Sequence, residues 1–324
     1  MADRRTSAPA GPSSPSHPVS GILLIDKPAG WTSHDVVEKV RRLTRQRKVG
    51  HAGTLDPLAT GLLVVCLGQA TRLVPYLIGH DKSYRATLRL GQSTDTYDAE
   101  GRITYEHSGP LPDRSEVEAV LPAFIGEIEQ EPPAFSAVKQ AGEPLYRRAR
   151  RGEEVAAPPR RVRIHRLELV EWNPPYLTLE VDCSAGTYVR SLAHDIGRRL
   201  GCGAHVAGLV RTRSGPFRLE EAVSLEELTS AGEWRRCMLP MDAGLGDLPA
   251  VVLSSDEVAR VGFGQALAGP VPADDRPVRA YSDDGRLIAI LHFDPTANLW
   301  RPKVVLAGME GGATSSHSDK REGP

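Results

Sequence analysis

The sequence of 324 residues contains few cysteines and few aromatic residues, and it has no long apolar run. Its four cysteines, Cys66, Cys183, Cys202 and Cys237, are widely spaced and form no CxxC pair. This spacing favours a reducing compartment and argues against a disulfide framework or a cysteine-rich zinc site. No apolar run reaches the roughly 18 residues that a membrane-spanning helix requires, which argues against an integral membrane protein. Because residues 1–20 also lack the apolar core of a secretory signal, we expect a cytoplasmic protein.

The composition along the chain predicts two domains between two tails. Residues 1–20 and 309–324 consist mostly of serine, proline, glycine and charged residues, which is typical of disordered extensions. After Pro240 the pattern changes to short strands with turns, including a hairpin signal at Asp284-Gly285. We therefore expect a large domain at 21–240 and a small β domain at 250–308.

The net charge of −1 conceals an uneven distribution of charge. Residues 35–51 carry six basic and two acidic residues, residues 139–166 nine and three, and residues 181–218 six and two. Residues 220–300 carry fourteen acidic and six basic residues. This asymmetry suits either a polyanion bound to the first two-thirds of the chain or ordinary solvated helix faces.

Apolar spacing predicts both strands and helices. The expected strands are 21–26, 62–67, 84–90, 162–171, 177–183 and 205–212, and the expected helices are 33–47, 69–78, 114–124 and 187–200. Residues 130–160 are expected to form a long, basic and partly irregular excursion. In the helix at 187–200 the spacing places Arg190 beside the apolar face, as a solvated residue.

The segment 50–61 (GHAGTLDPLATG) is the first candidate site. Its glycines permit turns that other residues resist, and Pro57 disfavours a helical conformation at Asp56. An acid held in such a loop, five residues after His51, is either a catalytic group or part of a structural Asp-Pro turn. Spacing alone leaves both interpretations open.

This segment resembles the catalytic signature of the TruB family, whose bacterial members convert uridine 55 in the T arm of tRNA to pseudouridine. Further segments resemble family motifs in the same order: 25–28 (IDKP) with 31–34 (WTSH), 82–84 (KSY) with 90–91 (LG) and 94–98 (TDTYD), 132–139 (PPAFSAVK), and 184–192 (SAGTYVRSL). Phe135 stands where a tyrosine is more usual. The likeness extends over residues 21–217.

The resemblance implies a pseudouridine synthase fold of the α/β class (α+β type), with a mixed, largely antiparallel central sheet flanked by helices. It also implies a basic thumb-like insertion at about 125–155 and a small C-terminal β domain of PUA type. The implied enzyme is an isomerase that acts on the tRNA T arm as a monomer and needs no cofactor or metal. It breaks the N1–C1′ bond of uridine, turns the uracil and rejoins it through C5. The sequence contains no GxGxxG, P-loop or HExxH pattern, which agrees with such a reaction.

The resemblance implies three catalytic residues and one apolar contact. Asp56 corresponds to the essential aspartate, which either attacks a reacting carbon or removes a proton next to C1′. Arg190 is implied to keep this carboxylate ionised inside a pocket that excludes water. Tyr84 is implied to stack on the target base and to assist the later proton step, and Leu209 to pack on the flipped uracil.

A further set of residues is implied to bind the substrate. His51 is expected to occupy the space that the flipped uridine leaves. Gly53, Lys27 and Lys82 belong to the same motifs. Contacts to phosphates are expected from the basic insertion, at Arg147, Arg148, Arg150, Arg151 and Arg160.

Two alternative functions stay open. One is a chaperone that folds the T arm without needing catalysis. The other is the guide-RNA-dependent catalytic subunit of an H/ACA particle, against which the insertion at 125–155 argues, because that branch lacks such a thumb. For a metal-dependent hydrolase the sequence offers no clustered set of His, Asp and Glu ligands.

Overall fold

The structure, a computed structural model, describes residues 19–306 apart from 136–138, 141–142, 154, 156 and 231–233. The chain divides into two compact units, residues 1–244 and 245–324. The predicted extensions lie outside the described residues except for Val19, which packs against the core, and Ser20, whose hydroxyl accepts a hydrogen bond from Gln69 N at 2.9 Å. No helix in the described ranges is long and apolar enough to cross a membrane.

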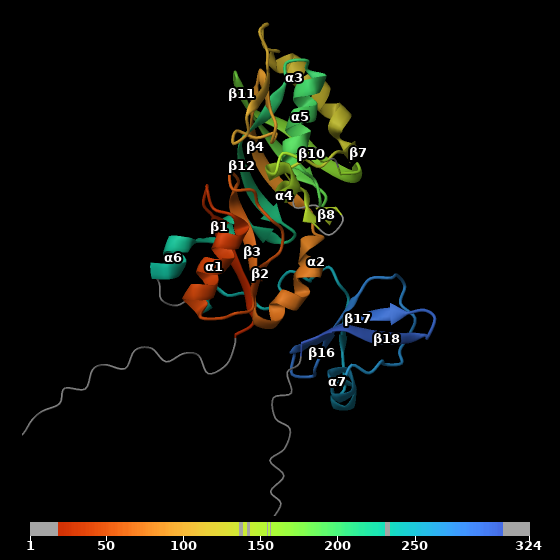
Figure 1. Cartoon of the computed structure of the whole chain (residues 1–324). Coiled ribbons are helices and arrows are strands. Elements are labelled where there is room, and N and C mark those ends of the chain that lie inside the picture. Colours follow the sequence, from red (N-terminus) through yellow and green to blue (C-terminus); the bar gives the residue numbers. More distant parts are fainter. Residues whose placement is uncertain are drawn as a thin grey trace, which may run out of the picture. The chain divides into compact units, whose positions relative to one another are not determined.

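A ten-stranded sheet forms the body of the first unit (Figure 1). Its strands are β1 (Gly21–Lys27), β2 (Val49–His51), β3 (Thr60–Leu67), β4 (Lys82–Leu90), β7 (Gly126–Gln130), β10 (Arg160–Asn173), β11 (Tyr176–Cys183), β12 (Ala204–Ser214), β13 (Phe217–Arg218) and β14 (Val223–Ser224). The main path runs β14-β1-β3-β12-β4-β11-β10-β7. The pairs β1–β14 and β3–β12 are parallel, and the other pairs of this sheet are antiparallel. The predicted mixed, largely antiparallel sheet is therefore confirmed.

Four helices share one apolar core with this sheet: α1 (Ser33–Thr44), α3 (Arg114–Val120), α5 (Val189–Arg199) and α6 (Leu225–Ser230). α1 begins where the side chains of Thr32 and Asp35 each accept a hydrogen bond from the other's backbone N–H. It then buries Val36, Val37 and Val40 against the sheet. The predicted helix at 69–78 is divided into a 3-10 turn η1 (Gly68–Leu73) and α2 (Val74–Ile78), and that at 114–124 into α3 and η2 (Leu121–Phe124).

Short elements complete the first unit. They are the hairpins β5 (Gln92–Thr94) with β6 (Ile103–Glu106) and β8 (Lys139–Gln140) with β9 (Glu143–Pro144), the helices α4 (Leu145–Arg150) and α6 (Leu225–Ser230), and the turns η3 (Leu219–Glu221) and η4 (Trp234–Cys237). The excursion at 130–160 thus contains regular structure that the sequence did not predict. Among the described side chains of α4, only Leu145 is apolar and fully buried. The segment therefore lacks the apolar periodicity from which a helix is predicted.

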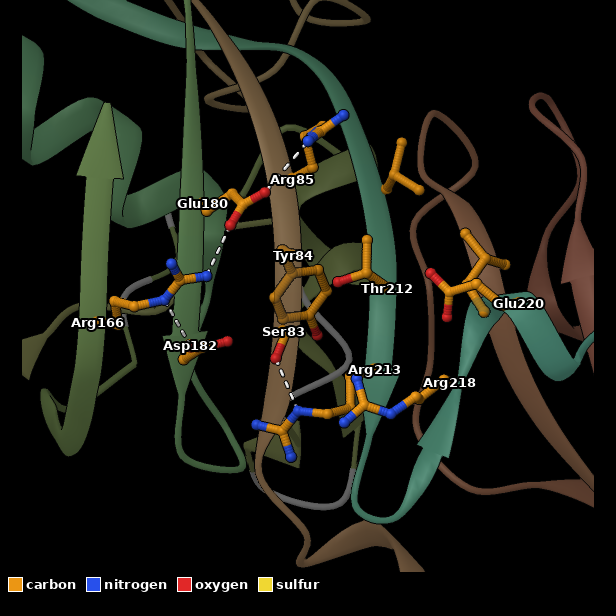
Figure 2. Close-up of a pocket in the computed structure, with 12 residues that line it drawn as sticks. Ser83, Tyr84, Arg85, Arg166, Glu180, Asp182, Thr212, Arg213, Arg218 and Glu220 are labelled. Atoms are coloured by element: carbon orange, nitrogen blue, oxygen red, sulfur yellow. Dashed lines mark hydrogen bonds and ion pairs between the residues drawn. The ribbon is translucent and has the colours of Figure 1, made fainter. Parts of the chain in front are cut away.

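The sheet carries paired charges on the side chains shown in Figure 2. Arg166 on β10 contacts Glu180 at 2.6 Å and Asp182 at 2.9 Å, both on β11. Glu180 also accepts a hydrogen bond from Arg85 on β4 at 3.1 Å. Because each of these charges has a partner of opposite sign, we attribute the cluster to strand pairing rather than to ligand binding.

The second unit has a four-stranded sheet in the order β15-β16-β17-β18, formed by Ala250–Val252, Val278–Tyr281, Leu287–Asp294 and Leu299–Val305. The predicted hairpin is confirmed as the antiparallel pair β16–β17. The helix α7 (Ser255–Gly262) was not predicted, although its capping box of Ser254 and Glu257 is a readable helix start. In this helix Val261 is buried in the core of the unit and Val258 packs against that core. Two apolar residues are too short a pattern to predict a helix.

Candidate active site

The loop between β2 and β3 holds Asp56 in a fixed backbone. The Ser33 hydroxyl at the start of α1 accepts a hydrogen bond from Leu55 N at 2.8 Å and donates one to Leu55 O at 3.2 Å. At the end of the loop, Gly61 has a φ of +92°, and a Cβ there would lie 2.5 Å from the carbonyl oxygen of Arg211. Glycine is therefore required where the loop enters β3. Both ends of the segment that carries Asp56 are anchored.

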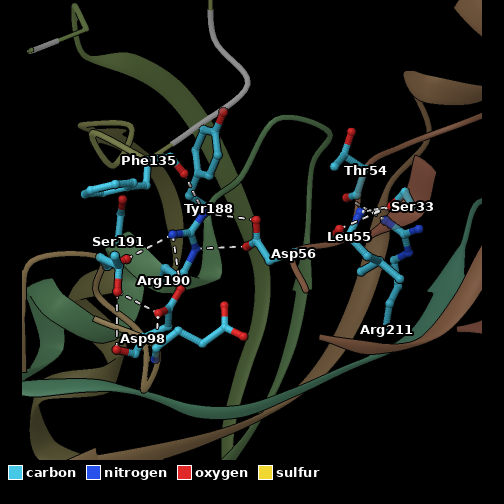
Figure 3. Close-up of polar contacts among 12 residues, drawn as sticks. Ser33, Thr54, Leu55, Asp56, Asp98, Phe135, Tyr188, Arg190, Ser191 and Arg211 are labelled. Atoms are coloured by element: carbon cyan, nitrogen blue, oxygen red, sulfur yellow. Dashed lines mark hydrogen bonds and ion pairs between the residues drawn. The ribbon is translucent and has the colours of Figure 1, made fainter. Parts of the chain in front are cut away.

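Asp56 forms an ion pair with Arg190 of α5 (Figure 3). Arg190 Nη2 donates to Asp56 Oδ1 at 3.0 Å, and Arg190 Nε lies 2.9 Å from Oδ2. The Arg190 side chain is 5% exposed and that of Asp56 is 33% exposed. The arginine is thus buried behind the carboxylate, while the carboxylate itself reaches open space.

Arg190 has further partners that fix its guanidinium. Nη1 donates to Thr96 O at 2.9 Å and lies 3.2 Å from Asp98 Oδ2, and Nη2 donates to Phe135 O at 3.0 Å. The prediction that Arg190 is a solvated residue beside the apolar face is therefore wrong. In the first turn of α5 the neighbouring segments 94–98 and 131–135 cover this position, and they supply the polar partners that make its burial favourable.

Two residues that sequence reasoning missed support Arg190. The Asp98 carboxylate is 5% exposed and pairs with it, and Asp98 stands in the motif 94–98, so the motif contained the signal. Gln130 at the end of β7 is 1% exposed; its side chain donates to Tyr188 O at 3.0 Å and accepts from Tyr188 N at 2.7 Å. It therefore pairs with the backbone two residues before Arg190 as another strand would. No local pattern indicates this role.

A cavity of about 310 Å³ opens beside Asp56. Tyr84, Leu209, Arg190 and Arg211 are among the side chains that line it. Burial raises the pKa of the Tyr84 phenol, against the opposing effect of the Arg211 charge. The volume is at the lower end of the range for small-ligand pockets, which suits a single flat ring better than a larger group. The structure thus brings together Asp56, Tyr84, Arg190, Leu209 and Gly53 at one cavity.

The two predicted lysines are already engaged by backbone carbonyls. Lys27 is fully buried, and its ammonium donates to the carbonyls of Pro28, Trp31 and Pro57 at 2.5–3.3 Å. Burial lowers its pKa to about 8. Lys82, also buried, donates to Ile78 O and His80 O, and burial lowers its pKa to about 8. Lys82 lines the cavity, whereas Lys27 braces the residue that follows Asp56.

The remaining predicted residues lie outside this cavity lining. His51 is half-buried at the end of β2, and burial lowers its pKa, so its ring is neutral near pH 7. Arg160 lies over the Tyr188 ring with its guanidinium carbon 5.4 Å from the centroid, and Arg147 is exposed. Arg148 and Arg151 are ion-paired to Glu153 at 2.7 and 2.8 Å. The Arg150 side chain and residues 136–138 of the third motif lie outside the described residues.

Among the described residues, no group of three or more His, Cys, Asp or Glu side chains is placed to hold a metal ion. The cavity itself presents the Asp56 carboxylate, the Tyr84 phenol and fixed cationic side chains.

Among solved structures, the chain is similar to one in the structure of an H/ACA RNP bound to a substrate RNA containing 2′-deoxyuridine. The two are 27% identical with a TM-score of 0.67, and the match covers 89% of this chain and 85% of that one. A chain in the crystal structure of a Cbf5-Nop10-Gar1 complex is 32% identical with a TM-score of 0.66, covering 84% and 78%. Both likenesses extend through most of the fold.

Family models and relatives agree with this likeness. Residues 41–189 match the TruB family pseudouridylate synthase N-terminal domain, and residues 190–246 match the tRNA pseudouridylate synthase B C-terminal domain. A protein named tRNA pseudouridine synthase B from Xanthomonas campestris pv. campestris is 45% identical over 300 residues, which are 91% of this chain and 97% of that protein. One of the same name from Syntrophotalea carbinolica is 48% identical over 258 residues, covering 79% and 84%. On these matches, the chain belongs to the TruB family of pseudouridylate synthases.

Proposed function

We propose that this chain isomerises uridine 55 in the T-arm loop of tRNA to pseudouridine. The observation that carries the proposal is the Asp56–Arg190 ion pair at the wall of a cavity that also exposes Tyr84 and Leu209. The relatives named tRNA pseudouridine synthase B support tRNA as the substrate. Because isomerisation leaves the oxidation state of the nucleoside unchanged, the reaction needs no redox cofactor.

Three residues of the site are proposed to act in the reaction together with Arg190. Asp56 either forms a bond to the reacting carbon or removes a proton next to C1′, and both routes need its carboxylate ionised. Arg190 supplies the opposing charge that favours this form. The Tyr84 ring and the Leu209 side chain offer flat apolar surface on which the freed uracil turns before its C5 bonds to C1′. The C5 proton then leaves to the solvent or to a nearby base.

The acid side of the pH profile tests this assignment. Desolvation by the surrounding protein raises the pKa of Asp56 above the ordinary value of 3.8. The Arg190 charge lowers this pKa, and the Asp98 charge raises it. We therefore expect single-turnover rates to fall with decreasing pH, with a midpoint above that of an exposed aspartate. Asp98→Asn removes a negative charge, so it should move this midpoint to lower pH while lowering the plateau rate, because Arg190 loses a partner.

The matched control for this profile is Asp95→Asn. Asp95 stands in the same loop, but its carboxylate pairs with the exposed Arg102 at 3.1 Å. Its removal should leave the midpoint unchanged. A midpoint that moves to higher pH in Asp98→Asn would contradict the assignment of this limb to Asp56.

His51 is proposed to fill the space that the flipped uridine leaves. Its neutral, half-buried ring is suited to a place between stacked bases. Since flipping costs a few kcal/mol, we expect His51→Ala to lower the single-turnover rate by about 10- to 100-fold, far less than a change at Asp56. His165→Ala, which removes an exposed histidine paired with Asp81, is the control. Loss in His51→Ala as complete as in Asp56→Asn would refute this division of labour.

The rest of the chain is proposed to bind the tRNA outside the target loop. We propose phosphate contacts for Arg147, Arg148, Arg150, Arg151 and Arg160, and a substrate-binding role for Lys27, Lys82 and Gly53. Two of these arginines would exchange carboxylate partners for phosphate, Arg148 its Glu153 and Arg151 its Glu143 and Glu153, so their net contribution to affinity is reduced.

The domain assignments follow the same proposal. Residues 21–240 would form the catalytic domain with its thumb at about 125–155, and 250–308 a PUA-like domain, between tails at 1–20 and 309–324. We propose a monomer that acts on tRNA in the cytoplasm.

The test is product formation on a bare substrate. Purified chain is incubated with an unmodified tRNA transcript, with EDTA and without guide RNA, and the digested nucleosides are separated. We expect one pseudouridine per tRNA. No product unless a guide RNA is added would favour an H/ACA-type subunit, and faster T-arm folding without any product would favour a chaperone.

A further inference from the structure

Arg211 of β12 is a buried cation beside the active site. Its side chain is 1% exposed and is the largest among the fully buried ones. Nε donates to Leu62 O at 2.7 Å, Nη2 to Gly53 O at 3.0 Å and Nη1 to Thr54 O at 3.4 Å. All three of these acceptors are backbone carbonyls, and the guanidinium also forms a side-chain hydrogen bond with Tyr84. Two of these carbonyls, those of Gly53 and Thr54, belong to the loop just before Asp56.

The Arg211 charge has no carboxylate partner among the described residues. Within the described part of the chain, no Asp or Glu oxygen lies within 4.0 Å of the Arg211 guanidinium. Arg190, the other buried arginine of the site, has two carboxylate partners. A buried charge without a counter-ion is costly, because desolvation is only partly offset by neutral acceptors. The positive charge of Arg211 therefore acts on neighbouring groups without being cancelled by a counter-ion.

Arg211 contacts both ends of the loop that carries Asp56. Its guanidinium binds the carbonyls of Gly53 and Thr54, and its backbone lies against Gly61, its partner in the parallel pairing of β3 and β12. Figure 3 shows its side chain beside Thr54 and Leu55. Any movement of β12 at this point would therefore move the backbone of the loop at both ends.

Arg211 also faces the cavity in which the base would turn. It lines the cavity with Asp56, Tyr84 and Leu209, and it stands opposite Tyr84 in the pairing of β12 with β4. Its charge acts on Tyr84, His51 and Lys82. A fixed cation at this wall stabilises negative charge that develops on the uracil or on the phenol oxygen during the reaction.

We propose that Arg211 is a positioning residue: it holds the backbone of residues 53–54, and through it the Asp56 carboxylate, against the cavity, and supplies that cavity with uncompensated positive charge. The inference rests on the proposed function. It differs from a purely structural role, which would change the stability of the fold without separating catalysis from binding.

Arg211→Lys tests the proposal, because lysine keeps the charge but replaces three separate nitrogens, each bound to its own carbonyl, with a single ammonium. We expect the single-turnover rate on a tRNA transcript to fall by about 100-fold, as for a displacement of reacting groups by about 1 Å. We expect the Kd for tRNA to stay within about threefold of wild type, since the buried guanidinium binds carbonyls of its own chain and is not among the residues proposed to contact phosphates. Arg211→Met, which removes the charge as well, should lower the rate further with the same Kd.

Arg213→Lys is the matched control on the same strand. Arg213 donates Nε to Ser83 Oγ at 2.9 Å and Nη1 to Gly215 O at 3.2 Å, and it lies among the side chains of Figure 2 rather than at the Asp56 cavity. Its rate should stay within about twofold of wild type. Thermal unfolding of every variant identifies those that are folded at the assay temperature. If Arg211→Lys is not folded, Arg211→Met still tests the proposal, because its apolar side chain leaves no unpaired charge in the interior.

The outcomes are distinct. A large fall in rate with unchanged Kd in a folded Arg211 variant supports the proposal. A folded Arg211 variant with a rate within threefold of wild type, or with rate and affinity reduced in the same proportion, overturns it. A wild-type chain that forms no pseudouridine in the same assay overturns the proposed function instead.

Discussion

Asp56→Asn is expected to abolish pseudouridine formation while tRNA binding persists. Asparagine keeps the size of the side chain but can neither form a bond to the reacting carbon nor accept a proton as a carboxylate does. We expect the single-turnover rate to fall by about 10⁴-fold or more, as for other residues that react directly with substrate. Filter binding and single-turnover kinetics on one T-arm transcript measure the two properties.

The fold should tolerate this change. Asp56 is one-third exposed, and Arg190 keeps Asp98 as its carboxylate partner when Asp56 is neutral. We therefore expect an unfolding temperature close to that of wild type. If folded Asp56→Asn retained more than about one-hundredth of the wild-type rate, Asp56 would not be the reacting carboxylate.

Arg190→Lys is expected to have the second-largest effect on catalysis. The guanidinium contacts Asp56 with two nitrogens and also binds Asp98, Thr96 O and Phe135 O, a set that one ammonium cannot reproduce. We expect the rate to fall by about 10³-fold, because lysine keeps the charge but loses the two-nitrogen contact that orients it beside the reacting carboxylate. Since Arg190 is 5% exposed, tRNA affinity should change little.

Arg190→Ala separates catalysis from stability. It leaves the buried Asp98 carboxylate without its cation, which typically costs about 3–5 kcal/mol of folding free energy. Chemical denaturation should therefore show a large loss for Arg190→Ala and a smaller one for Arg190→Lys. A folded Arg190→Ala with a near wild-type single-turnover rate would refute the pairing with Asp56.

The sequence predicted the reacting residues better than the residues that hold them. Asp56 and Tyr84 were identified by motifs and Leu209 by the family resemblance, and the structure places them at one cavity. Their catalytic roles stay predictions. Arg190 was identified only by its motif, because helical periodicity counts apolar neighbours and assigns an arginine to the solvent. Its burial depends on acceptors from two distant segments, Thr96 and Phe135, which periodicity does not include.

The supporting residues could not be predicted for the same physical reason. Gln130 pairs with Tyr188, and Arg211 with Gly53, across 58 and 158 positions of the chain. A buried polar side chain is favourable only where its partners are present, and those partners are set by the tertiary fold. Lys27 is also fully buried, against three carbonyls, and its motif does not indicate this burial.

The most direct test of the central claim is release of tritium from uracil C5 in a tRNA T-arm transcript. Joining C5 to C1′ expels the C5 hydrogen, so each pseudouridine formed releases one label. We expect the wild-type chain, without guide RNA, to release the label of a single uridine in the loop, at position 55, and Asp56→Asn to release none. Tight binding of the transcript by the wild-type chain with no release of tritium would contradict the account.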